Sequence, residues 1–116
     1  MTANPRQRAA RKRPDHTIVV VDQMTGEPAG HVGNLSLSGM LLIADHPFVE
    51  DALYQLAFSL PHNHGQRTIE IGAHEQWLAD GTVHGQQWVG LQFIDISEDD
   101  ENVLRQWLEH AADEER

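Results

Sequence analysis

One short polar stretch, set between two apolar runs, reads Gly33-Asn34-Leu35-Ser36-Leu37-Ser38-Gly39. In an extended segment alternate side chains share a face, so we expect Asn34 and Ser36 to point the same way and to offer hydrogen-bonding groups together. Gly39 has no Cβ, so it can adopt a positive φ or let a ligand approach the backbone. The same residue types also form ordinary turns, and residue type alone favours that simpler interpretation.

Charge is distributed unevenly along the chain. The net charge is −10, yet residues 1–14 contain five basic residues and no acidic one. These basic residues are Arg6, Arg8, Arg11, Lys12 and Arg13. An acidic body argues against broad binding of DNA or RNA, which requires a basic face. A compact basic arm suits a small ligand that carries phosphates; the alternative is a solvated tail that only improves solubility.

Length and composition limit the class of protein further. The 116 residues suffice for one domain with a buried core, and the absence of cysteine excludes disulfides and thiolate chemistry. No apolar run approaches the roughly 20 residues that span a bilayer. The basic N-terminus lacks the apolar segment of a signal peptide. We therefore expect a cytoplasmic protein that does not insert into a membrane.

Six segments have the composition of β-strands. They are rich in β-branched and apolar residues, are bounded by turn residues, and cover 17–22, 29–35, 39–43, 53–60, 67–78 and 86–96. Helical spacing and strand alternation fit residues 53–60 equally well, and the neighbouring strands favour a strand. In the fifth segment, alternation places Ile69, Ile71, Ala73 and Trp77 on one face.

Turns, a loop and one helix complete the predicted order. Turns are expected at 25–28 and 80–81, and a loop at 61–65, with Pro61 ending the strand before it. A helix is expected over about 97–112, with Ser97 as its N-cap. Its apolar stripe consists of Val103, Leu104, Trp107, Leu108 and Ala111. Residues 1–14 are expected to form a disordered arm and residues 113–116 a frayed tail.

This order of elements predicts an all-β domain over residues 15–112, a small antiparallel barrel with a C-terminal helix. His62 and His64 suggest a metal site, but zinc needs three or four ligands and no cysteine is present, so a surface loop is the better interpretation. The sequence also lacks a nucleophile–base pair, a convincing carboxylate pair and the glycine patterns of nucleotide-binding enzymes. We therefore expect no catalytic residues and no metal.

From about Arg8 to Trp107 the chain resembles a PilZ domain. The Asn34-x-Ser36-x-x-Gly39 motif matches the family's Asp/Asn-x-Ser-x-x-Gly and precedes an apolar strand. A basic arm lies before the first strand. Two late strands follow, with Trp77 in one and Gly90-Leu91-Gln92-Phe93 in the next, ahead of the helix. The resemblance implies a six-stranded barrel with a helix, with residues 53–60 as a strand.

The resemblance also implies a receptor for the bacterial second messenger cyclic di-GMP, with no other cofactor. The expected ligand-binding residues are Arg8, Arg11, Lys12, Arg13, Asn34, Ser36, Gly39 and Trp77. Ordering of the arm would signal to an effector protein, such as a component of motility or biofilm machinery. The family's arm carries Arg-x-x-x-Arg, whereas here Lys12 takes the second place after Arg8, and lysine lacks the planar fork of arginine. The alternative is a PilZ-like adaptor that binds proteins and no nucleotide.

Overall fold

The computed structural model describes the backbone of residues 11–114 and the side chains of residues 11–110. This part of the chain forms six strands and one helix: β1 (Val19–Asp22), β2 (Glu27–Leu35), β3 (Gly39–Ala44), β4 (Leu53–His62), β5 (Gly65–Asp80), β6 (Gln87–Ile96) and α2 (Glu98–Glu114). The strands close into an antiparallel barrel in the order β1-β2-β3-β6-β5-β4. The predicted fold class is confirmed, and residues 53–60 belong to a strand.

The loop expected at residues 61–65 is shorter than predicted. Pro61 does not end β4, because it pairs with Gln66 of β5, and the predicted loop shrinks to Asn63 and His64. Both turn residues have positive φ (50° and 64°), as a type I′ hairpin turn requires. Proline fits here because the described pairs of β1 with β4 involve only Leu56 and Ala57 of β4, so the missing N–H is needed by no strand.

The other connections differ from the prediction in a similar way. β2 begins at Glu27, so Pro28 of the expected turn already pairs with Val21 of β1. The connection after β5 spans residues 81–86, which is longer than the expected turn at Asp80-Gly81. These differences shift the ends of strands and leave their order unchanged.

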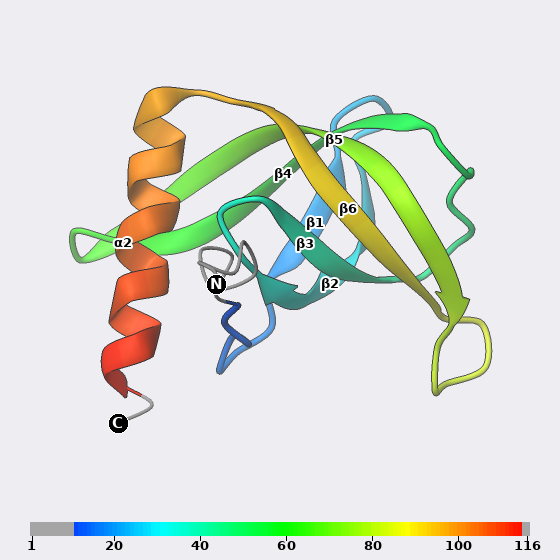
Figure 1. The fold of residues 1–116 in the computed structure, drawn as a ribbon, viewed down its shortest axis with the longest axis horizontal. Coiled ribbons are helices and arrows are strands. Elements are labelled where there is room, and N and C mark those ends of the chain that lie inside the picture. Colours follow the sequence, from blue (N-terminus) through cyan, green and yellow to red (C-terminus); the bar gives the residue numbers. More distant parts are fainter. Residues whose placement is uncertain (1–10, 115–116) are drawn as a thin grey trace, which may run out of the picture.

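The helix α2 stands at one end of the barrel, opposite the end from which the β5–β6 connection projects (Figure 1). Ser97 caps the helix as predicted, since its hydroxyl accepts a hydrogen bond of 3.1 Å from the N–H of Asp100. The Asp100 side chain in turn accepts hydrogen bonds from Arg67 and from the N–H of Glu70, each 3.0 Å long. The first turn of α2 is thereby fixed to β5.

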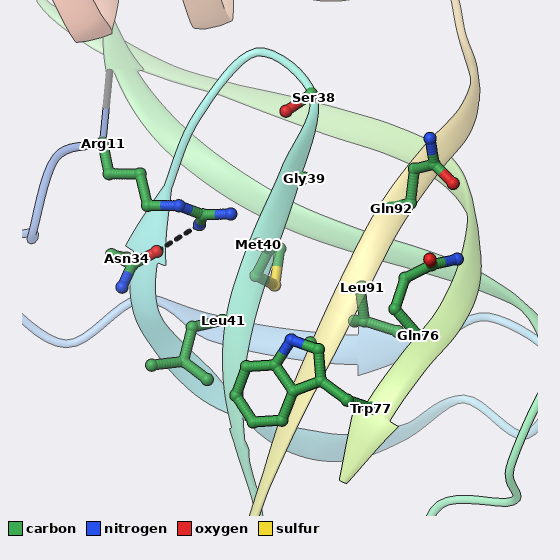
Figure 2. A pocket seen from close by; sticks show the side chains of 11 residues that line it. Arg11, Asn34, Ser38, Gly39, Met40, Leu41, Gln76, Trp77, Leu91 and Gln92 are labelled. Carbon is green, nitrogen blue, oxygen red and sulfur yellow. Dashed lines mark hydrogen bonds between the residues drawn. The ribbon is translucent and has the colours of Figure 1, made fainter. Parts of the chain in front are cut away.

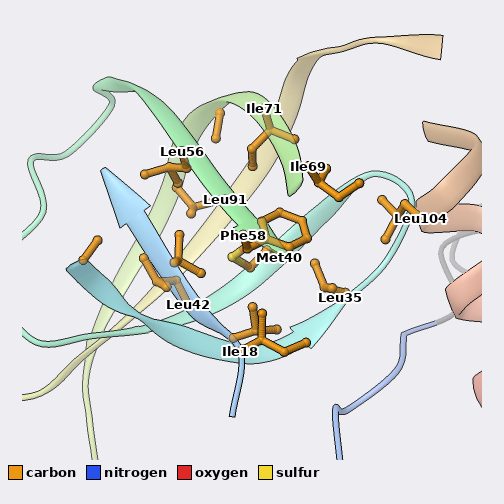
Figure 3. Close-up of a cluster of buried hydrophobic side chains, with 14 of the residues drawn as sticks. Ile18, Leu35, Met40, Leu42, Leu56, Phe58, Ile69, Ile71, Leu91 and Leu104 are labelled. Atoms are coloured by element: carbon orange, nitrogen blue, oxygen red, sulfur yellow. The ribbon is translucent and has the colours of Figure 1, made fainter. Parts of the chain in front are cut away.

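The apolar face of α2 closes the core of the barrel. Figure 3 shows Leu104 directed at the barrel interior near Phe58 and Ile69. Val103, Leu104 and Trp107 are buried and Leu108 is partly buried, which confirms the predicted stripe except for Ala111, whose side chain lies outside the described residues. The helix continues to Glu114, beyond the expected end at residue 112. Within the described part of the chain, no helix combines the length and apolar character needed to cross a membrane.

Candidate functional site

A bulge in β2 determines where the side chain of Asn34 lies. Val32 pairs with Leu42 and both side chains are buried, but the next pair joins Asn34 to Leu41, which leaves Gly33 as an extra residue. An extra residue reverses the alternation of the strand. Asn34 therefore lies on the outer face of the barrel, although the regular pattern after Val32 would place it inside.

A second bulge, in β5, determines where the side chain of Trp77 lies. Glu75 pairs with Leu91 and is buried, whereas Trp77 pairs with Gly90 and leaves Gln76 unpaired between them. The prediction that Trp77 shares a face with Ile69, Ile71 and Ala73 is therefore wrong. Those three side chains are at most 1% exposed, whereas Trp77 is 49% exposed. The bulge turns the indole outward, where it is accessible to a ligand.

The end of the basic arm lies beside the bulged part of β2. The backbone of Lys12 exchanges two hydrogen bonds with Leu35, of 2.8 and 2.9 Å. This bridge places the Arg11 guanidinium next to Asn34, whose side-chain oxygen accepts a hydrogen bond from it. Arg11 and Lys12, at the end of the arm, therefore lie against β2. Arg8 and the remainder of the arm lie outside the described residues.

Arg11, Asn34 and Trp77 meet at one pocket of about 380 Å³ on the outer face of the barrel. Figure 2 shows Arg11 and Asn34 at one side of this pocket and Trp77 at the other. Leu41 of β3 lies between them. None of the described lining residues is acidic, despite the net charge of −10. The pocket thus combines a cation, an amide and an exposed aromatic face.

Ser36 takes a different position from the one expected. Its side chain is fully buried, and its hydroxyl accepts hydrogen bonds of 3.2 Å from the N–H groups of Ser38 and Gly39. The prediction that Ser36 and Asn34 point the same way is therefore wrong, because the strand ends between them and Ser36 begins a turn. Ser36 holds the turn that positions β3, and the exposed Ser38 lines the pocket in its place.

Gly39 lines the pocket through its backbone. A Cβ at this position would lie 2.2 Å from the carbonyl oxygen of Leu91, because β3 and β6 approach closely here. The need for glycine therefore comes from contact between two strands. Of the two alternatives considered for Gly39, a positive φ does not occur.

Lys12 and Arg13, the other predicted residues of the arm, lie apart from this pocket. The Lys12 side chain is 8% exposed and its ammonium group lies 4.1 Å from the ring centroid of Trp107, a cation–π contact with α2. Its Nζ is also 3.5 Å from the carbonyl oxygen of Trp107. Arg13 is exposed and lines a neighbouring hollow on the same face. The lysine that replaces the second arginine of the motif thus faces the helix.

The sequence did not identify three of the residues that line the pocket: Ser38, Gln76 and Gln92. The role of Gly90 was also not predicted. A Cβ on Gly90 would lie 2.1 Å from the indole Nε1 of Trp77. The sequence predicted that Gly90 and Gln92 belong to the strand that is now β6. That Trp77 covers Gly90 follows only from the register between β5 and β6.

The histidines of the β4–β5 hairpin lie beside α2, outside the candidate pocket. His62 and His64 border a hollow together with His16 and His110. Among the described residues, no group of three or more histidine, aspartate or glutamate side chains is arranged to hold a metal ion.

Comparisons with known proteins agree with this fold. The family model for the PilZ domain matches residues 5–110. No curated protein matches the chain. Two solved structures are similar: the Bacillus subtilis inhibitor of motility (MotI/DgrA), with 21% identity and a TM-score of 0.71, and K. pneumonia MrkH in its apo state, with 19% identity and a TM-score of 0.71. They match over 94% and 98% of this chain, respectively. The chain spans only 51% and 53% of their lengths.

Proposed function

This chain belongs to the PilZ domain family, a family of cyclic di-GMP receptors that are binding domains and not enzymes, and we propose that it binds cyclic di-GMP in the pocket between Arg11, Asn34 and Trp77. The observation that carries the proposal is the convergence of these three side chains. They come from the arm, β2 and β5, and two bulges are needed to bring the latter two to one face.

The three side chains suit a guanine base. The exposed face of Trp77 offers a stacking surface, which contributes about 1–3 kcal/mol per base in other nucleic-acid-binding proteins. The Arg11 guanidinium can donate two hydrogen bonds to guanine O6 and N7. One of its five donors is engaged by Asn34, which leaves others for a ligand. The Asn34 amide retains two donors for the base edge or a phosphate.

The charge of the pocket suits the phosphates of the ligand. Among the described residues that line the pocket, Arg11 alone is charged. Arg13 lies nearby on the same face. Charge-assisted hydrogen bonds to phosphate oxygens are about twice as strong as neutral ones. Arg8 remains an expected further contact, supplied by the part of the arm outside the described residues.

The contact between Lys12 and Trp107 offers a route from the pocket to α2. Arg11 faces the pocket while its neighbour Lys12 packs on the helix, so a ligand that moves or orders the arm also changes a contact of α2. An effector protein that contacts α2 or the arm would read this change. One structural neighbour is named as an inhibitor of motility, and a component of motility or biofilm machinery is the kind of effector we expect here.

A calorimetric titration with cyclic di-GMP, with GTP as the control ligand, tests the proposal. We expect saturable binding of cyclic di-GMP with a Kd in the micromolar range or below, and weaker or no binding of GTP. Tryptophan fluorescence should change in the same titration, because Trp77 lines the pocket. If both calorimetry and fluorescence stay flat at high ligand concentration, the chain is not a receptor, and the adaptor function without nucleotide becomes the better description.

A further inference from the structure

A second hollow of about 300 Å³ adjoins the pocket on the same outer face. Asn34 and Leu41 border both, so the two lie side by side. The second hollow is lined on its far side by Arg13 of the arm, His31 of β2 and Trp88 of β6. Neither His31 nor Trp88 has a part in the function proposed above.

The strand register shows that the two hollows are neighbouring rows of one surface. The first row joins Asn34 to Leu41, and Leu41 to Gly90, which Trp77 covers. The second row joins His31 to Ile43, and Ile43 to Trp88. Along β3 and β6 the rows are two residues apart, which corresponds to roughly 7 Å. Residues two apart face the same side of a strand, so both rows face outward.

The arm supplies one arginine to each row. Lys12 is buried in its bridge to Leu35, whereas Arg11 before it and Arg13 after it are exposed. Arg11 borders the first hollow and Arg13 the second. Each row therefore presents the same pair of groups, an arginine from the arm and a tryptophan from the barrel. The bridge at Lys12 sets the spacing between the two arginines.

We propose that Arg13, His31 and Trp88 form a subsite for a second guanine base. The half-buried Trp88 would stack on the base, the Arg13 guanidinium would bind its O6 and N7 edge or an adjacent phosphate, and His31 would donate or accept a hydrogen bond. This inference rests on the proposed binding of cyclic di-GMP. The second base comes either from the other half of the same molecule or from a second molecule bound beside the first.

Calorimetric titration of cyclic di-GMP into the full chain and into Arg13→Ala and Trp88→Leu variants tests this subsite. Arg105→Ala, which removes an exposed arginine of α2, is the matched control for charge. Arg13 is exposed, so its replacement should not disturb the fold, and thermal unfolding would verify this for both variants. If the second base belongs to the same molecule, we expect a stoichiometry of one and at least a tenfold increase in Kd. If it belongs to a second molecule, we expect the stoichiometry to fall from two to one.

The outcomes separate this inference from the function on which it rests. A wild-type chain that binds no cyclic di-GMP would overturn both. A wild-type chain that binds, with Arg11→Ala weakening binding while Arg13→Ala and folded Trp88→Leu keep the wild-type stoichiometry and a Kd within twofold, would overturn the second subsite alone. Loss of affinity in Arg105→Ala equal to that in Arg13→Ala would show a general charge effect and would also contradict the subsite.

Discussion

The indole of Trp77 lies so close to the backbone of Gly90 that a Cβ on this glycine would be 2.1 Å from the indole Nε1 and 2.3 Å from Cε2. The two residues are paired across β5 and β6, and no residue larger than glycine would leave the ring in this position. The contact fixes one side of the candidate pocket. Trp77 is 49% exposed, so a change in the position of its ring should have little effect on the stability of the barrel.

We predict that Gly90→Ala weakens binding of cyclic di-GMP at least tenfold, because the added Cβ displaces the stacking surface of Trp77. Stability should change little, since the ring can move into solvent. Gly65→Ala is the matched control, because a Cβ there would have its nearest neighbour at 3.8 Å and the backbone φ is not positive. Calorimetry and thermal unfolding measure the two effects. Unchanged affinity in Gly90→Ala would show that the position of Trp77 does not matter for the ligand.

Ser36 is predicted to contribute to stability through the turn. Ser36→Ala leaves the N–H groups of Ser38 and Gly39 without the hydroxyl that accepts their hydrogen bonds, and an unsatisfied buried donor costs about 1–3 kcal/mol. Urea unfolding should show a loss of that order. Ser38 is exposed and its hydroxyl is hydrogen-bonded to that of Ser36 at 3.2 Å, but Ser38→Ala leaves both N–H groups with their acceptor and should change the free energy of unfolding by less than about 0.5 kcal/mol. Equal effects of the two changes would contradict the role given to Ser36.

Asp100 is predicted to hold α2 against the barrel. Asp100→Ala removes the hydrogen bonds to Arg67 and to the N–H of Glu70 and should destabilise the fold by about 1–3 kcal/mol. The neighbouring Asp99 is exposed and serves as the control, because Asp99→Ala changes the charge of the same helical turn without breaking these contacts. Chemical denaturation followed by circular dichroism would measure both. The prediction fails if the two variants are equally stable.

Restoring arginine at position 12 should not strengthen binding. The Lys12 side chain packs on Trp107 and faces α2, so Lys12→Arg completes the family's arginine spacing without placing a guanidinium in the pocket. We expect Lys12→Arg to bind cyclic di-GMP with a Kd within about threefold of wild type. A tenfold gain in affinity, measured by calorimetry, would mean that residue 12 turns toward the ligand.

The strands and the helix could be predicted from the sequence because their apolar residues repeat with a clear period. Val89 and Leu91 are buried at alternate positions of β6, and Val103, Leu104 and Trp107 form the expected helical stripe. The resemblance to the PilZ family predicted Asn34 and Trp77 as ligand-binding residues, and both line the pocket. Regular patterns and a short motif were sufficient for these features.

The faces of individual side chains could not be predicted where a strand is irregular. The bulges at Gly33 and Gln76 reverse the alternation, and a bulge depends on how two strands pair, which local sequence does not reveal. The common face predicted for Ser36 and Asn34 was wrong for another reason, because β2 ends at Leu35 and Ser36 begins a turn. The direction of Lys12 depends on α2, which is distant in sequence. No motif in the sequence identifies Gln76, Gln92 and Ser38 as pocket residues. Their position in the pocket follows only from the arrangement of the strands.

The most direct test of the binding site compares Arg11→Ala with Arg105→Ala in a calorimetric titration with cyclic di-GMP. Each variant removes one exposed arginine, but only Arg11 borders the pocket and contacts Asn34. We predict at least tenfold weaker binding for Arg11→Ala, and wild-type binding for Arg105→Ala. Wild-type affinity in Arg11→Ala would contradict the assignment of this pocket as the cyclic di-GMP site.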